Sequence, residues 1–79
     1  MTRDRRRRLA KAVEMLDAAK GIIGEVRDEE RVAFATLPDS VRHAGSGQAV
    51  EAAAAALDTA YGDADELFDL VADLAGLSE

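Results

Sequence analysis

Hydrophobic residues recur at intervals of three and four on both sides of a single cluster of helix-breaking residues. That cluster runs from Pro38, the only proline, to Gly45 and Gly47. Such spacing is typical of one face of an α-helix, and its seven-residue repeat is typical of a coiled coil. The pattern predicts a first helix over about 4–36 and a second over about 47–75. The repeating positions are Leu9, Ala12, Val13, Leu16, Ala19, Ile23, Val26, Ala33 and Leu37, then Val50, Ala53, Leu57, Ala60, Ala64, Leu67, Val71 and Leu74.

The segment between the two predicted helices, about 37–46, is short. A connection of this length makes consecutive helices fold back on each other, so we expect an antiparallel hairpin. Ser46 has the chemistry of an N-cap for the second helix, and Gly76 that of its C-terminal stop. Thr36 is expected to cap a short turn beginning at Pro38, since proline suits a first helical position.

The same hairpin predicts which residues face each other. If the turn is centred in this segment, positions whose numbers sum to about 85 lie opposite. Phe34 then faces the alanine run 52–56, and Tyr61 faces Gly24, with Gly21 one turn away. A large side chain meets a small one in both places, which allows two helices to approach closely. Glycine within a helix costs about 1 kcal/mol relative to alanine, so a packing reason for it is expected.

Further apolar residues lie beside the main stripe and widen the hydrophobic face: Met15, Ile22, Phe68, Leu70 and Leu77. A wide apolar face on a two-helix unit requires another layer, and a homodimer forming a four-helix bundle supplies it. Higher oligomers and an unknown protein partner are the alternatives. The residues assigned to self-association are Leu9, Val13, Leu16, Ile23, Val26, Phe34, Leu57, Tyr61, Leu67, Phe68, Val71 and Leu74.

The chain has 79 residues and no cysteine. This length indicates a single domain over 1–79, and a core this small is marginal without tight packing or a partner. No apolar run approaches the length of a membrane span, and the basic start lacks the hydrophobic region of a secretory signal. We therefore expect a cytoplasmic protein, with no disulfide and no cofactor.

The net charge of −6 is distributed unevenly. Residues 1–11 hold six basic residues and one acid, whereas residues 47–79 hold eight acids and no lysine or arginine. The expected explanation is pairing across the hairpin between the N-terminal arginines and Asp69, Asp73 and Glu79, although each exposed pair contributes little.

Two other functions fit this charge distribution. The run Arg5, Arg6, Arg7 and Arg8 could contact nucleic acid, but it has no interleaved aromatic residues and no recognisable recognition helix. The acidic second helix could mimic a phosphate array and inhibit a DNA-binding partner.

Carboxylates at helical spacing raise the question of catalysis. Glu25, Asp28 and Glu29 share one helical face, and Glu66 and Asp69 repeat the three-residue spacing found in magnesium-dependent hydrolases. The two groups lie about two helical turns apart in the hairpin, on the order of 10 Å, which is too far for one metal. The neighbouring arginines favour ion pairs instead, including Arg27 with Asp58, and the lone histidine, His43, is expected at the surface of the turn. We expect no enzyme and no metal site.

Short motifs resemble those of a family of small uncharacterised phage and prophage helical-hairpin proteins. The matching pieces are "EVRDEE" at 25–30, "AF" at 33–34 and "LPDS" at 37–40, between a basic first helix and an acidic second helix. The resemblance implies a helical hairpin of mobile-element origin and carries no catalytic residues. The sequence thus favours a small self-associating structural or interaction module.

Overall fold

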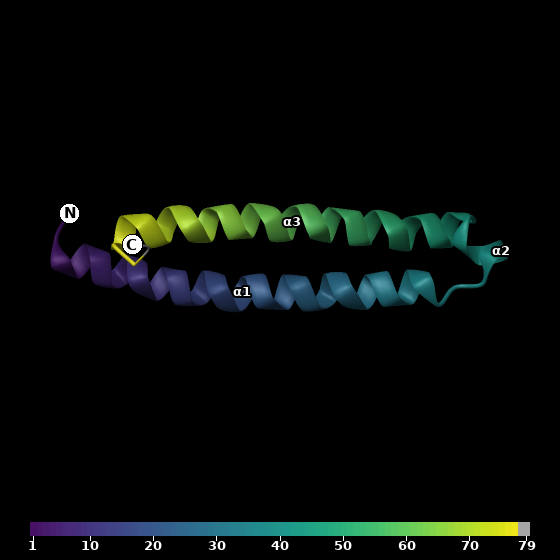
Figure 1. Ribbon diagram of the computed structural model, residues 1–79, viewed down its shortest axis with the longest axis horizontal. Coiled ribbons are helices and arrows are strands. Elements are labelled where there is room, and N and C mark those ends of the chain that lie inside the picture. Colours follow the sequence, from purple (N-terminus) through teal and green to yellow (C-terminus); the bar gives the residue numbers. More distant parts are fainter. Residues whose placement is uncertain (78–79) are drawn as a thin grey trace.

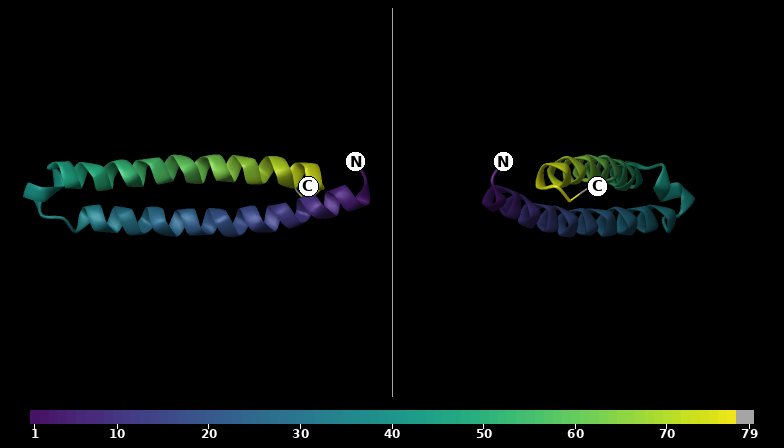
Figure 2. Two further views of the ribbon diagram at one scale, coloured as in Figure 1. Left: turned by 180° about the vertical axis from the view of Figure 1, so that it is seen from behind. Right: turned by 60° about the vertical axis from the view of Figure 1, so that its left-hand side comes forward.

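The computed structural model describes residues 1–77, and these residues form helices joined by short turns (Figure 1). The elements are α1 (Arg3–Ala35), α2 (Asp39–Arg42) and α3 (Gly45–Ala75). The described residues contain no strand, which confirms the all-α class. The long helices α1 and α3 run antiparallel and side by side, and the opposite views of Figure 2 show the same arrangement. α1 extends beyond the end of α3 at its N-terminus.

Caps define both ends of α1. The hydroxyl of Thr2 accepts a hydrogen bond from the backbone N–H of Arg5 at 3.2 Å, as expected of an N-cap. Thr36 is the C-cap of α1, so the prediction that it caps the following turn was wrong. Its hydroxyl donates to the carbonyl of Ala33 at 3.0 Å, which ties it to the helix before it.

The start of α3 also differs from the prediction. Ala44, not Ser46, is the N-cap, and the first helical hydrogen bond runs from the N–H of Gln48 to the Ala44 carbonyl at 2.9 Å. Gly47 lets the start of α3 lie close to α2, because a Cβ at this position would collide with the carbonyl oxygens of Val41 and Arg42. At the other end the predicted stop is confirmed: Gly76 has φ 76°, in the left-handed region that favours glycine.

Arg42 closes the connection between the long helices. Its guanidinium donates hydrogen bonds to the carbonyls of Ala35 at 3.3 Å and Leu37 at 3.1 Å. It also pairs with Asp39 at 3.3 Å and lies 5.7 Å from the centre of the Phe34 ring. Helix ends leave carbonyls without partners, and a basic side chain near them satisfies this need. α2 thus supplies the basic group that the last turn of α1 lacks.

The contact between α1 and α3 follows the spacing of a coiled coil. The buried and half-buried residues include one series on each helix that alternates strictly between intervals of three and four. We call these two series the seam. On α1 the seam is Leu9, Val13, Leu16, Lys20, Ile23, Arg27, Glu30 and Phe34. On α3 it is Gly47, Val50, Ala54, Leu57, Tyr61, Ala64, Phe68, Val71 and Ala75.

The hairpin is one layer of helices thick. It measures 58 × 18 × 14 Å, and its radius of gyration is 17.3 Å, compared with about 12 Å for a compact domain of this length. The buried hydrophobic residues are Val13, Ala54 and Ala72, and no large side chain within residues 1–77 is fully buried. Two helices in contact bury one stripe on each, so most of their remaining surface faces outward.

Candidate self-association surface

A second apolar stripe lies on each long helix beside the seam. Every position in it directly precedes a seam position, so it repeats with the same spacing. All its members are apolar except Glu29 and Asp63. We call the two stripes together the outer face. It comprises Ala12, Met15, Ala19, Ile22, Val26, Glu29 and Ala33 on α1, and Ala49, Ala53, Ala56, Ala60, Asp63, Leu67, Leu70 and Leu74 on α3.

Both stripes lie on the same side of the hairpin, as the ion pairs between the helices establish. Asp58, Asp65 and Arg31 each directly follow a seam position. Lys20 pairs with Asp65 at 2.8 Å, and Arg31 pairs with Asp58 at 3.0 Å, so the positions after the seam meet on one flank. The positions before the seam therefore share the opposite flank.

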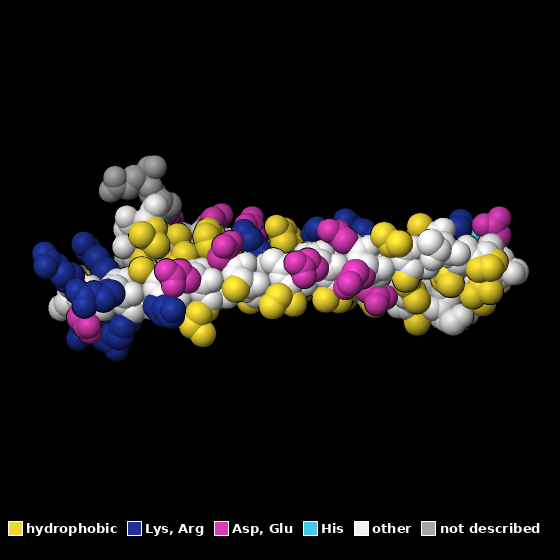
Figure 3. Space-filling view, turned by 90° about the horizontal axis from the view of Figure 1, so that it is seen from below, with side chains coloured by type: hydrophobic (Ala, Val, Ile, Leu, Met, Phe, Trp, Pro, Cys, Tyr) yellow, Lys and Arg dark blue, Asp and Glu magenta, His cyan; other side chains and the backbone are white. Residues whose placement is uncertain are grey.

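Large side chains of the outer face remain exposed. Met15 is 65% exposed, Ile22 61% and Leu70 63%. Figure 3 shows hydrophobic side chains along the lower edge of the rod, while those on the upper edge lie among charged side chains, and most of the basic side chains in this view gather at the N-terminal end. Singly exposed hydrophobic residues are normal, but a contiguous stripe on two adjacent helices is typical of an interaction surface.

The structure divides the twelve predicted self-association residues into two groups. Nine lie in the seam within one chain: Leu9, Val13, Leu16, Ile23, Phe34, Leu57, Tyr61, Phe68 and Val71. The other three, Val26, Leu67 and Leu74, lie on the outer face and are exposed. Of the residues that the sequence placed beside the main stripe, Phe68 belongs to the seam, whereas Met15, Ile22 and Leu70 belong to the outer face.

The hairpin exposes more surface than a compact monomer of the same mass. The accessible surface is 5620 Å² for a mass of 8.4 kDa. A compact folded monomer of this mass exposes about 4,600 Å², so the hairpin exposes about 1,000 Å² more. A standard protein–protein interface buries about 800 Å² of each partner. The excess is therefore of the size that one such interface would cover.

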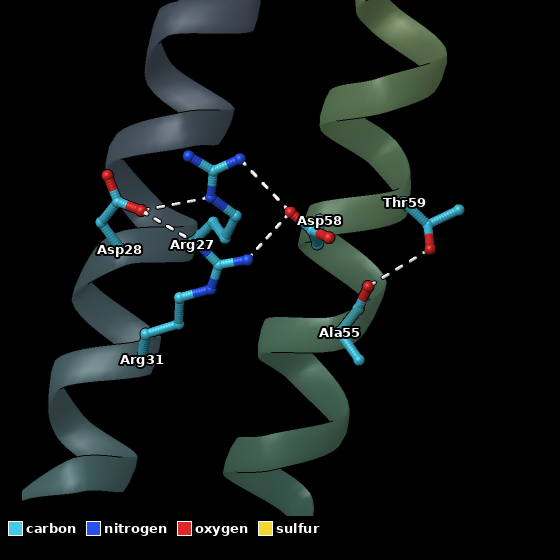
Figure 4. Close-up of polar contacts among 6 residues, drawn as sticks. All are labelled: Arg27, Asp28, Arg31, Ala55, Asp58 and Thr59. Carbon is cyan, nitrogen blue, oxygen red and sulfur yellow. Dashed lines mark hydrogen bonds and ion pairs between the residues drawn. The ribbon is translucent and has the colours of Figure 1, made fainter.

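Charged side chains of α1 and α3 meet on the flank opposite the outer face, as Figure 4 shows for Arg27, Arg31 and Asp58. Arg27 and Arg31 of α1 both reach Asp58 of α3, at 3.4 and 3.0 Å, and both also pair with Asp28. The predicted pairing of Arg27 with Asp58 is confirmed. Arg27 occupies a seam position with its side chain 18% exposed, and its guanidinium lies 4.6 Å from the centre of the Tyr61 ring. Its alkyl stem fills the seam while its charge reaches the flank.

Lys20 repeats this arrangement closer to the N-terminus. Its side chain is 17% exposed, and its Nζ lies 4.6 Å from the centre of the Phe68 ring and 5.9 Å from that of Tyr61. The same Nζ donates a hydrogen bond to Asp65 at 2.8 Å. This bond raises the pKa of Lys20 above its ordinary value of 10.5, against the opposing effect of burial. Lys20 and Arg27 of the α1 seam thus both form ion pairs with aspartates of α3.

The N-terminal arginines do not make the predicted pair with Asp69 across the hairpin. Arg8 pairs with Asp4 of its own helix at 3.2 Å, and within residues 1–77 no ion pair is made by Arg3, Arg5, Arg6 or Arg7. The register explains this, because the first turns of α1 project beyond the end of α3. Of the predicted acidic partners, Glu79 lies outside the described residues. We call residues 3–8 the basic tip.

Few other features suggest chemistry. Met1, Arg5, Arg8 and Leu9 line a shallow, open depression at the basic tip. Within residues 1–77 no three histidine or carboxylate side chains converge as a metal site would require. His43 is exposed at the end of α2, where its carbonyl accepts a hydrogen bond from Gln48 at 3.4 Å. None of the helices in this part of the chain has the length and apolarity needed to cross a bilayer.

Comparison with known proteins finds no relative. The chain matches no family model, no curated protein and no solved structure.

Proposed function

We propose that this protein is a small self-associating structural or interaction module without catalytic activity. The observation that carries the proposal is the outer face, an apolar surface on both long helices that only Glu29 and Asp63 interrupt. The seam alone buries little, and a second layer of helices would bury Met15, Ile22 and Leu70. Burial contributes about 25 cal/mol per Å² of apolar surface, so covering this face would add several kcal/mol before the costs of association.

The homodimer is the assembly we favour, because one chain with one apolar face requires one matching face. The product is a four-helix bundle, in which each hairpin supplies two helices. A cytoplasmic location belongs to the same proposal. So does a phage or mobile-element origin, for which the short motifs at 25–30 and 37–40 are the support.

The test is the mass of the protein in solution, measured by light scattering after size-exclusion chromatography. At micromolar concentration we expect twice the mass of one chain. Ile22→Glu should reduce the mass to that of a monomer, because it places a charge in the proposed interface. Val32→Glu is the matched control: Val32 is also 62% exposed on α1 but belongs to neither the seam nor the outer face. A folded wild-type monomer at this concentration would refute the proposal.

Binding of nucleic acid by the basic tip is the second candidate, and one observation favours it. Arg3, Arg5, Arg6 and Arg7 have no ion-pair partner within residues 1–77, so their charges are available to phosphates. The acidic α3 opposes this function because it repels a polyanion. Inhibition of a DNA-binding protein by α3 has less support, since Asp58 and Asp65 already pair with α1.

A further inference from the structure

We infer that two copies pack through their outer faces with opposite ends together, so that α3 of each lies antiparallel on α3 of the other. This inference rests on the proposed function, because it specifies the geometry of the proposed dimer. It follows from the order of large and small residues along α3, from the position of the basic tip and from the level at which Asp63 lies.

Two arrangements satisfy a twofold axis between the outer faces. If the axis runs along the helices, both basic tips lie at one end and α1 of each chain lies on α3 of the other. If the axis lies across the helices, the tips lie at opposite ends, α1 packs on α1 and α3 packs on α3. Both arrangements bury the same face, so its composition decides between them.

The order of side-chain sizes along α3 fits the second arrangement. The outer face of α3 carries alanine at 49, 53, 56 and 60, then Asp63, then leucine at 67, 70 and 74. Residues of α1 and α3 lie side by side where their numbers sum to 85, as the pairs Lys20–Asp65 and Arg27–Asp58 show. When the axis passes at the level of Asp63, Ala60 lies near Leu67 of the other copy, and Ala56 near Leu70. Every leucine of this α3 stripe then meets an alanine of the other α3, while on α1 the same axis places Ile22 against Ile22 of the other copy.

The first arrangement pairs Ala12 with Leu74 and Ala19 with Leu67, but two of its levels fit poorly. Met15 of one chain would meet Leu70 of the other, because 15 and 70 sum to 85, so two large residues would compete for one space. Ala33 would meet Ala53 near the turn, and two small residues would leave a gap between the helices.

Charge favours the second arrangement as well. The first would place two basic tips side by side, each with arginines that no carboxylate within residues 1–77 neutralises. The second places the tips at opposite ends of a rod whose single chain is already 58 Å long, which is several Debye lengths at physiological salt.

Asp63 marks the twofold axis in this geometry. It is the acid between the alanine and leucine halves of the α3 stripe, so the two Asp63 carboxylates of a dimer face each other. Facing like charges weaken the dimer. Asp63→Asn should therefore lower its dissociation constant, by roughly two- to fivefold for an exposed pair.

Cross-linking tests the inference directly, because the natural chain has no cysteine. We expect Asp63→Cys to form a disulfide-linked dimer on mild oxidation. A mixture of Ala56→Cys and Leu70→Cys chains should give mixed cross-links. Val32→Cys, on the outside of α1, is the control for random collision and should give few.

The rival arrangement makes a different cross-link. It brings Ala19 of one chain beside Leu67 of the other, so a mixture of Ala19→Cys and Leu67→Cys chains would link while Asp63→Cys would not. That result, with the mass of two chains, would overturn the inference and leave the proposed function standing. A monomer mass for the uncross-linked wild type would overturn both.

A second measurement needs no cysteine. Asp63→Lys chains mixed with wild-type chains should form heterodimers in excess of the statistical share, since lysine then faces aspartate across the axis. Native mass spectrometry of the mixture counts the three dimers. A statistical distribution would overturn the inference even where each protein dimerises alone.

Discussion

The ring of Tyr61 packs against the backbone of Gly24, so closely that a Cβ at residue 24 would lie 3.1 Å from the ring atom Cε2. Gly24 is buried in the middle of α1, and the absence of its side chain makes room for the ring. Gly21, one turn earlier, has no such neighbour, because a Cβ there would meet no atom within 4 Å. The predicted pairing of Tyr61 with Gly24 is therefore confirmed, whereas Gly21, one turn away, does not contact the ring.

Gly24→Leu should lower the melting temperature, although leucine is the better helix former. Overpacking costs about 1–3 kcal/mol, against about 1 kcal/mol gained in helix propensity. Gly21→Leu is the control and should raise the melting temperature by several degrees, since it gains propensity without a clash. Thermal unfolding followed by circular dichroism at one fixed protein concentration compares them. A rise for Gly24→Leu equal to that for Gly21→Leu would contradict the close contact.

Gly47→Ala should destabilise the hairpin at its turn. The added Cβ would overlap the carbonyl oxygens of Val41 and Arg42, which are backbone atoms and cannot move independently of α2. The loss should reach about 1–3 kcal/mol, the usual cost of overpacking. Gly45→Ala is the matched substitution two residues away, where a Cβ meets open space. Urea denaturation of both variants should show a clear loss for Gly47→Ala alone, and equal midpoints would contradict this role of Gly47.

Stability should decline in alkali partly through Lys20. Its hydrogen bond to Asp65 raises the pKa of Lys20 in the folded protein above 10.5, so this contribution is complete below that pH. It is lost as the pH rises through the higher folded pKa, because the neutral amine no longer attracts the carboxylate. Lys20→Met keeps the alkyl stem, and its free energy of unfolding should fall less than that of wild type between pH 9 and 12.

Arg27→Met provides the control for this measurement. Arginine stays charged throughout this range, so replacing it should leave the alkaline decline unchanged. Asp65→Asn should reduce the decline in the same way as Lys20→Met. If Lys20→Met and Asp65→Asn both declined as steeply as wild type, the Lys20–Asp65 bond would contribute nothing in alkali.

The arginines of the basic tip should bind DNA at low salt only. The charges of Arg3, Arg5, Arg6 and Arg7 are unpaired within residues 1–77, but the net charge of −6 opposes a polyanion beyond the reach of the tip. We expect weak binding to single-stranded or duplex DNA in 20 mM salt and none at 150 mM, measured by fluorescence anisotropy. Replacing Arg5, Arg6, Arg7 and Arg8 with glutamine should abolish the low-salt binding. Micromolar binding at 150 mM salt that disappears in this variant would make nucleic acid the primary partner.

Local signals in the sequence determined the helices and their register. Pro38 and the glycines after it mark one turn, and apolar spacing on each side marks two long helices. A short connection between two such helices leaves few ways to pair them. For this reason the contacts of Gly24 with Tyr61 and of Arg27 with Asp58 could be predicted.

Only the tertiary structure separated the seam from the outer face. The two stripes have the same spacing and are offset by one residue, so both contribute to one broad apolar pattern. The polarity of a residue also does not predict its burial here, because Lys20 and Arg27 lie in the seam while Met15 and Leu70 face outward. A long basic side chain can bury its alkyl stem between the helices while its charged end reaches a carboxylate. The contacts of Lys20 and Arg27 with α3 therefore help to decide which stripe of α1 faces α3. Close contacts of the turn, such as those of Arg42 and Gly47, depend on backbone atoms brought together by the fold, and no residue pattern records them.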